Sequence, residues 1–231
     1  MRSPSFAALL LALASRVTAT SPGPPTPIWL RTCNWYANTT YISSDVNYDT
    51  HGTPAGKVPE SRVLLLNECY TQKLEPGLAF GSFIGLRNNT ESAEVGSKRT
   101  HDTKIEVTVE MDGTPPYFDV DVEKGWSAPV VFKATSPDGN VTTRAGCTVD
   151  KLLQCPEHMQ VWENNNTTLA NCVGKGQEAI DFFRADCPDL FVLSSDTRAV
   201  TSAPVGTKIL ELDIGVPPWE VDDVGCEEAL Q

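Results

Sequence analysis

The sequence has little of the apolar material from which membrane proteins are built. Its one long apolar run is the first, within MRSPSFAALLLALASRVTAT, and no later segment is apolar enough to span a bilayer. Arg2 gives a positive start, residues 6–14 are apolar, and residues 17–19 form a small-x-small cleavage site. This pattern predicts a secretory signal peptide over residues 1–19 and a secreted, extracellular protein. An uncleaved N-terminal anchor is the weaker alternative.

Basic residues are also scarce. The 231 residues contain 18 Lys and Arg against 30 Asp and Glu, which gives a formal net charge of −12. Loss of Arg2 and Arg16 with the signal peptide takes this charge to about −14. A chain this acidic is repelled by phosphate backbones and anionic lipid, so nucleic acids and membranes are excluded as expected partners.

Histidine is rarer still, and its scarcity limits the possible chemistry. His51, His101 and His158 are scattered singly, and no close-spaced Cys or His pairs suggest a zinc site. The sequence has no G-x-S-x-G turn and no legible Ser-His-Asp or Cys-His arrangement. We therefore expect no metal, no cofactor and no histidine-based enzyme.

Cysteine, by contrast, is present in a number suited to a secreted protein. The seven cysteines are Cys33, Cys69, Cys147, Cys155, Cys172, Cys187 and Cys226. In an oxidising compartment most of them should form disulfides, and their spacing favours disulfides over metal binding. The odd number leaves one thiol that is either free or bonded to another chain.

Asn-x-Ser/Thr sequences mark expected surface loops and glycans. They occur at Asn38, Asn88, Asn140, Asn165 and Asn166. The last two are adjacent, so we do not expect both to be used, but the NNNTT cluster indicates an exposed loop in either case.

After a Pro-rich lead over residues 20–26, short β-branched or aromatic runs alternate with turn residues. We expect strands at 28–36, 62–70, 78–86, 104–111, 117–122, 129–134 and 207–216. Such spacing indicates an antiparallel sandwich or barrel. Residues 135–147 are expected to be a loop, 176–185 a helix with Ile180 and Phe183 or Phe182 facing inward, and 217–231 an acidic tail.

Two neighbouring strands concentrate carboxylates on one face. In KIEVTVEM, Glu106 alternates with apolar residues, and in YFDVDV, Asp119 and Asp121 do the same. If these strands pair as a hairpin, their acids crowd on one surface, and like charges placed opposite each other cost stability. Either something offsets that cost or the carboxylates are spread into water.

Residues 117–196 carry three motifs in an order that resembles the thaumatin-like (osmotin, pathogenesis-related group 5) family. YFDVDVEKGWSAPVVF is similar to that family's FYDVSLVDGFNLPM stretch. AGCTVDKLLQCPEHMQVW is similar to its AGC…D(V/I)N…CPSEL(Q/K)V segment. DFFRADCPDLFVLSSD is similar to its (Y/R)FFK…CPDAYSYPQDD segment, while the N-terminal third matches loosely.

The resemblance implies a β-sandwich core and a smaller disulfide-stapled lobe, separated by an acidic cleft that binds β-1,3-glucan. The core would span about 27–134 and 206–216, and the lobe about 135–205 of a domain covering 27–216. The resemblance also implies the pairs Cys147–Cys187, Cys155–Cys172 and Cys33–Cys226, which would leave Cys69 over. We expect a monomer unless Cys69 or Cys226 pairs between chains.

The same resemblance implies cleft residues. Glu106 stands where the family has a cleft glutamate, and Asp119 and Asp196 match two of its aspartates. A further family aspartate falls on Lys124, beside Glu123, and the family's cleft arginine falls on or near Phe83, while Arg87 matches a different arginine. Aromatic rings that could stack on sugar are Tyr117, Trp126 and Phe191.

Three interpretations of this acidic surface stay open. In the first, Glu106, Asp119, Asp121 and Asp196 bind cell-wall β-1,3-glucan without catalysis. In the second, Glu106 and Asp119 are the carboxyl pair of a weak endo-β-1,3-glucanase, at about 5–5.5 Å for a nucleophilic route or about 6.5–9.5 Å for an inverting one. In the third, the acids are a solvated face on an interaction protein, such as an apoplastic effector or inhibitor, and the changes at Lys124 and Phe83 favour this over catalysis.

Overall fold

A computed structural model gives the arrangement of most of the chain. The residues that it describes are 27–36, 39–44, 48–49, 62–87, 102–109, 114–163, 168–193 and 199–217. No helix among them is long and apolar enough to cross a membrane. The expected signal peptide, most of the expected tail, Asp196, Cys226 and every predicted glycosylation site except Asn140 lie outside the described residues.

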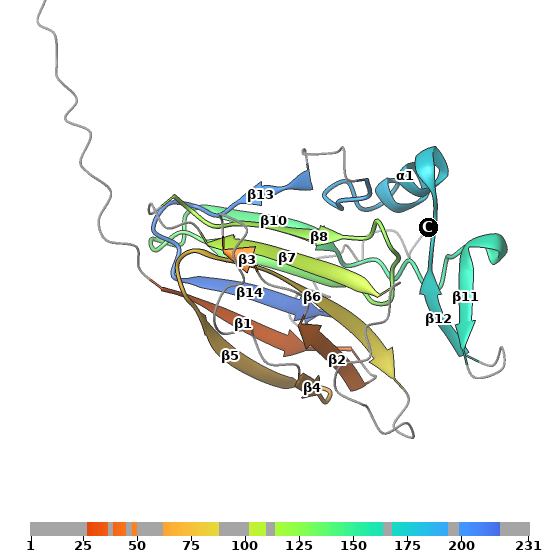
Figure 1. The fold of residues 1–231 in the computed structure, drawn as a ribbon, viewed down its shortest axis with the longest axis horizontal. Coiled ribbons are helices and arrows are strands. Elements are labelled where there is room, and N and C mark those ends of the chain that lie inside the picture. The colour runs from red at the N-terminus through yellow and green to blue at the C-terminus, as the bar shows by residue number, and fades with distance from the viewer. Residues whose placement is uncertain are drawn as a thin grey trace, which may run out of the picture.

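Two sheets are stacked face to face (Figure 1). The first sheet has the order β10 (Thr142–Cys147), β9 (Val130–Thr135), β14 (Ile209–Ile214), β1 (Ile28–Asn34) and β5 (Glu68–Leu74). The second has the order β13 (Thr201–Ser202), β8 (Tyr117–Asp121), β7 (Thr103–Val109), β6 (Leu78–Arg87), β2 (Thr39–Ser44) and β4 (Arg62–Leu64), and β3 (Tyr48–Asp49) pairs with β6.

The core lies between the inner faces of the two sheets. Along β7 every second residue is buried, as the alternation of apolar side chains requires. Phe118 of β8 meets Phe132 of β9 at a ring-centroid distance of 4.7 Å, which joins one sheet to the other. Because Phe118 points inward, Asp119 must point to the outer face of the second sheet.

The described strands are not all antiparallel. β1 pairs with β14 in parallel register from Trp29↔Ile209 to Asn34↔Ile214, whereas its other neighbour, β5, is antiparallel. The predicted sandwich is therefore confirmed as the architecture, with one parallel pair that the expectation of an antiparallel sandwich did not include.

Two secondary-structure predictions were wrong. Residues 135–147, expected to be a loop, contain β10, which pairs with β9 and so belongs to the first sheet. The strand expected over 62–70 is divided into β4 and β5 by a turn at 65–67, where Asn67 has a positive φ of 63°. The turn is closed by the Glu68 carboxylate, which accepts the backbone N–H of Leu65 at 2.9 Å.

A smaller lobe lies at one end of the strands (Figure 1). It contains a short 3₁₀ turn (Glu157–Met159), the hairpin β11 (Gln160–Glu163) and β12 (Thr168–Cys172), and the helix α1 (Gly176–Arg184). The helix lies almost where it was predicted, with Phe183 buried and with Ile180 and Phe182 packed against the core.

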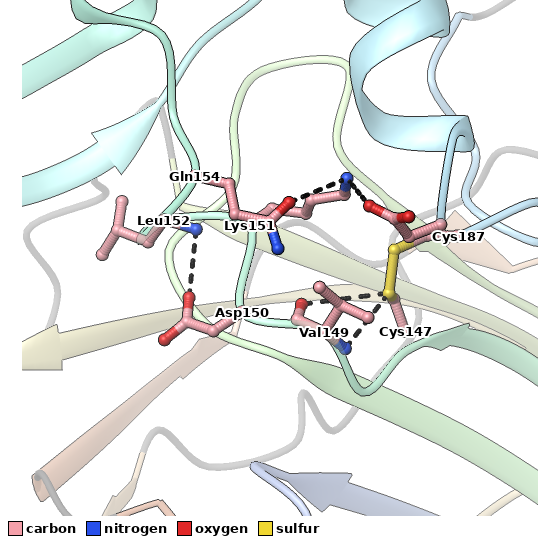
Figure 2. A network of polar contacts seen from close by, with 8 residues as sticks. Cys147, Val149, Asp150, Lys151, Leu152, Gln154 and Cys187 are labelled. Carbon is pink, nitrogen blue, oxygen red and sulfur yellow. Dashed lines mark hydrogen bonds and ion pairs between the residues drawn. A yellow bond between two sulfur atoms is a disulfide. The ribbon is translucent and has the colours of Figure 1, made fainter. Parts of the chain in front are cut away.

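A buried lysine, Lys151, joins the turn at residues 151–154 to the segment that follows α1. Lys151 is 1% exposed, and its Nζ contacts Asp186 and lies 3.5 Å from the amide oxygen of Gln154 (Figure 2). The same Nζ lies 4.8 Å from the centroid of the Phe182 ring. The adjacent Cys147–Cys187 disulfide joins the end of β10 to the segment after α1.

The disulfides confirm two of the three expected pairs. Cys147–Cys187 and Cys155–Cys172 are present as the motif resemblance implied. The expectation of Cys33–Cys226 was wrong, because Cys33 is bonded to Cys69. These two residues are directly opposite in the β1·β5 ladder, with Cα atoms 4.1 Å apart, so the register of the two strands brings their sulfurs together.

Candidate functional site

The predicted hairpin of acidic strands is present and places its charged residues in opposed pairs. In the β7·β8 register Glu106 lies opposite Asp119, and Lys104 lies opposite Asp121. We call these four residues the acid face. The alternation that turns Phe118 into the core turns all four to the other side of the sheet.

The acid face is not a solvated surface. Asp119 is 5% exposed and Asp121 is 7% exposed, whereas 41% of the Glu106 side chain reaches solvent. Phe191 forms a bridge with Asp121, its backbone N–H donating to Val120 and its carbonyl accepting from Val122. The carboxylates of β8 are therefore enclosed where the lobe meets the sheet, rather than spread into water.

Burial and crowding change the acidity of both aspartates. Burial, followed by the negative charges of Glu106 and Asp121, raises the pKa of Asp119 from 3.8 to about 8, although Lys104 acts in the opposite direction. Burial also raises the pKa of Asp121 to about 6, against a hydrogen bond of 2.7 Å from the backbone N–H of Glu123. Lys104 contacts Glu106 directly. The hairpin thus places an Asp119 with a raised pKa directly opposite Glu106, which contacts Lys104.

One carboxyl oxygen of Asp119 is left without a partner. Its Oδ1 is buried and makes no hydrogen bond. A buried polar atom without a partner costs about 1–3 kcal/mol, and such atoms in native structures call for an explanation. Among the described residues Asp119 is the one carboxyl group with such an atom, which makes it the first candidate for a role beyond stability.

The three aromatic candidates are placed differently. Tyr117 is 37% exposed at the start of β8, and Phe191 is half-buried beside Asp121. Trp126 is fully buried, exchanges backbone hydrogen bonds with Cys172 of β12, and lies 6.3 Å from the Phe183 ring. Its ring belongs to the junction of lobe and sandwich and offers no face to a ligand.

The positions at which the chain departs from the thaumatin-like motifs are also clear. Lys124 is 63% exposed in its side chain and lies 4.0 Å from Glu123. Phe83 is buried on β6, directly opposite Lys104. A positive charge is therefore present beside Phe83, on the neighbouring strand.

Sequence reasoning missed two residues of this region, Lys104 and Asp102. Lys104 shares the alternation that identified Glu106, so its position could have been found from the same pattern. Asp102 is buried, and its Oδ1 accepts a hydrogen bond of 3.0 Å from the amide of Asn171 in β12. This bond joins the start of β7 to the lobe, but residues so far apart in sequence give no local signal of it.

Within the part of the chain that the structure describes, no three His, Cys, Asp or Glu side chains are arranged to hold a metal ion. The acid face supplies hydrogen-bonding and charged groups. Its possible chemistry is the recognition of hydroxyl groups or proton transfer between carboxyl groups.

Comparisons with known proteins give no sequence relative. No protein-family model and no curated protein matches the chain. Among solved structures, the protein elicitor MoHrip2 from Magnaporthe oryzae matches at 11% identity and a TM-score of 0.36, over 82% of this chain and 99% of that one.

Two further solved structures are similar at the same level. A laminaripentaose-producing β-1,3-glucanase in complex with laminaritetraose matches at 13% identity and a TM-score of 0.45, over 70% of this chain and 55% of that one. The thaumatin-like xylanase inhibitor TLXI matches at 13% identity and a TM-score of 0.39, over 80% and 97%. At these scores none of the three assigns an activity to this chain.

The strands and disulfides of the chain establish its architecture. It combines a β-sandwich, a lobe closed by Cys155–Cys172, and a Cys147–Cys187 bond from sandwich to lobe, as the three motifs implied. This is the architecture that the resemblance to the thaumatin-like family implied. The acid face lies on the outer side of the second sheet, where β8 meets the lobe.

Proposed function

We propose that this is a secreted protein that binds cell-wall β-1,3-glucan at the acid face. The observation that carries the proposal is Asp119, which is buried and unpartnered at Oδ1, directly opposite Glu106, with a pKa raised by that burial. Placing these groups together costs stability, and perturbed carboxyl groups of this kind occur mainly at functional sites.

The acid face offers complementary groups to a neutral sugar. Glu106 is half-exposed and accepts hydrogen bonds, and Lys104 beside it donates them. Asp119 on the neighbouring strand is 5% exposed, so it acts on the site through Glu106 opposite it and not by direct contact with the sugar. Tyr117 at the start of β8 and Phe191 beside Asp121 supply apolar ring surface at either end. Asp196, which is expected to contribute, lies outside the described residues.

A second candidate function, weak glucan hydrolysis, is favoured by one observation. The pKa of Asp119 is raised by burial and by the negative charge of Glu106 opposite it. A carboxyl group with a raised pKa facing a second carboxyl group is the arrangement that glycosidases use for a general acid and its partner. The burial of Asp119 argues against this function, because a general acid must reach the glycosidic oxygen.

Retention on insoluble β-1,3-glucan tests the proposal. Wild type is compared with Glu106→Gln/Asp119→Asn and with Glu211→Gln as a matched control. Glu211 on the outer face of the first sheet has the same 41% side-chain exposure as Glu106 and is paired with Arg31 at 3.5 Å. We expect wild type and the control to be retained and the double variant to be lost, with cellulose and chitin retaining none of them.

The other outcomes identify the alternatives. Release of soluble oligosaccharide by wild type and not by the double variant would assign hydrolysis to the pair. Equal retention of all three proteins would place any sugar site elsewhere. Retention of none would contradict sugar binding and favour an interaction protein, for which the next experiment is capture of extracellular protein partners.

A further inference from the structure

The lobe exposes a tryptophan that the acid face does not use. Trp162 on β11 is 45% exposed, although Trp126 and Trp35 bury their rings wholly or in part. The residues beside it on the hairpin are the polar Gln160 and Glu163 and the half-buried Leu169. Trp162 is therefore a single indole on a polar surface and not part of a broad apolar patch.

Hydrogen bonds fix the indole in place by its edge. Its Nε1 donates to Oε1 of Gln160 at 3.0 Å, and Nε2 of Gln160 donates to the backbone carbonyl of Cys155 at 2.9 Å. Cys155 is bonded to Cys172, which is the partner of Gln160 in the β11·β12 ladder. The ring is thus connected through one amide to the disulfide at the base of the hairpin, so little conformational entropy remains to be lost when a ligand covers it.

Strand geometry places the Trp162 ring on the same side of the hairpin as Gln160. In β12 the register passes from Asn171 to Leu169 as β11 passes from Val161 to Trp162, so Ala170 is an extra, unpaired residue. The extra residue belongs to β12, so β11 keeps its ordinary alternation, and Gln160 and Trp162, two residues apart, share one side, as their hydrogen bond shows. Asn171, opposite Val161, faces the other way and bonds to Asp102.

We propose that Trp162 and Gln160 form a stacking platform for a pyranose ring, separate from the acid face. The free face of an indole matches the apolar face of one sugar ring in size. The Gln160 amide still has one N–H and one acceptor position for hydroxyl groups at the edge of the ring. A protein partner would instead need about 800 Å² of complementary surface on this side, which one indole among polar residues does not supply.

The sugar can come from two sources, an external polysaccharide or a glycan on the chain itself, and the experiment separates them. The indole N–H signal of Trp162 is followed by NMR in protein made with and without N-glycosylation, and is assigned from its loss in Trp162→Phe. Laminarihexaose and cellohexaose are the probes. Trp29→Ala is the matched control, because Trp29 is 44% exposed on the outer face of the first sheet.

With an external polysaccharide as the source, the probe shifts the Trp162 signal in unglycosylated protein. Trp162→Ala then weakens binding about tenfold, Trp162→Phe weakens it less, and Trp29→Ala has no effect. With the protein's own glycan as the source, the Trp162 signal differs between glycosylated and unglycosylated protein. The probe then shifts this signal in unglycosylated protein and leaves it unchanged in glycosylated protein.

An unmoved Trp162 signal under both conditions would overturn the proposal, as would equal losses in Trp162→Ala and Trp29→Ala. Near-ultraviolet circular dichroism checks that each variant is folded. The Trp162 response is expected to persist in Glu106→Gln/Asp119→Asn. The Trp162 signal therefore tests the stacking platform, and retention on β-1,3-glucan tests the acid face, so either proposal can fail without the other.

Discussion

At the scale of single residues, Asp119 is the clearest example of a group whose placement lowers the stability of the fold. Its carboxyl group is enclosed on the outer face of the second sheet, opposite Glu106 and near Asp121, with one oxygen unpartnered. Each of these features disfavours the ionised form, so the group keeps its proton at pH values where an exposed aspartate would have lost it.

We expect the free energy of unfolding to fall as pH rises from about 4 to about 8. Over that range the unfolded chain has lost the Asp119 proton while the folded protein still holds it, so raising the pH favours unfolding. Asp121 adds to the slope between about 4 and 6. Urea unfolding followed by fluorescence at several pH values should show a loss of several kcal/mol, at about 1.4 kcal/mol for each pH unit over which only the folded protein keeps the proton.

Asp119→Asn should remove most of this slope and make the protein more stable than wild type at pH 8, because an amide resembles the protonated acid. Glu211→Gln should leave the slope as it is, since that residue lies on the other sheet with 41% of its side chain exposed. An unchanged slope in Asp119→Asn would show that other groups cause the pH dependence.

The sequence allowed some of these residues to be predicted and not others. Period-two alternation placed Glu106 and Asp119 on one face, because it depends only on strand geometry. Alternation could not show that this face is enclosed, because the enclosing contact comes from Phe191, far along the chain. For the same reason Trp126 was expected to be a ligand contact but is buried, while the exposed Trp162 was not considered.

At the scale of elements, β10 shows why a strand can be mistaken for a loop. TTRAGC has no alternating apolar pattern, and the preceding SPDGN has every sign of a turn. Both features are real, because residues 136–141 form the turn of the β9–β10 hairpin, closed by the Ser136 N–H to Val141 carbonyl bond of 2.8 Å. What makes the next six residues a strand is pairing with β9.

Two glycines of this hairpin give a matched pair of substitutions. Gly146 in β10 has φ of 102°, and a Cβ there would lie 2.1 Å from the Val130 carbonyl oxygen. Gly139 in the turn has φ of 75° with nothing within 4 Å of its Cβ position. We expect Gly146→Ala to cost more than about 3 kcal/mol and Gly139→Ala only about 1 kcal/mol, measured by urea unfolding. Equal costs would show that the sheet moves away from the added methyl group.

The disulfide between β1 and β5 leads to a second prediction about elements. Peptide mapping without reduction should recover Cys33 linked to Cys69, because the ladder places these residues opposite each other. A recovered Cys33–Cys226 peptide would contradict the structure. The pairing could not be predicted from the sequence, since it depends on which strands are neighbours and in what register.

For the whole molecule, the position of β14 matters most. Although it is the last of the described strands in sequence, it lies between β9 and β1 in the middle of the first sheet and buries Leu210 and Leu212. Predicting Ile209–Ile214 as a strand required only its local pattern. Its parallel place beside β1 depends on contacts across some 180 residues, which no local pattern encodes.

We therefore expect two truncations to behave oppositely. A chain ending at residue 207 lacks β14 and should not fold, because the two halves of the first sheet lose the strand that joins them. A chain ending at residue 217 keeps every described strand and should fold and unfold cooperatively. Circular dichroism and urea unfolding of both chains provide the measurement. A folded product ending at 207 would contradict this account of the sheet.

The parallel pairing of β1 and β14 also determines how the molecule responds to force. The described part of the chain begins next to the start of β1 and ends just after β14, and these two points lie at opposite ends of one ladder of six residue pairs. Tension between them pulls the strands lengthwise past each other and loads all six pairs together, instead of peeling them apart one by one. Held at both ends, this sandwich is a mechanical clamp.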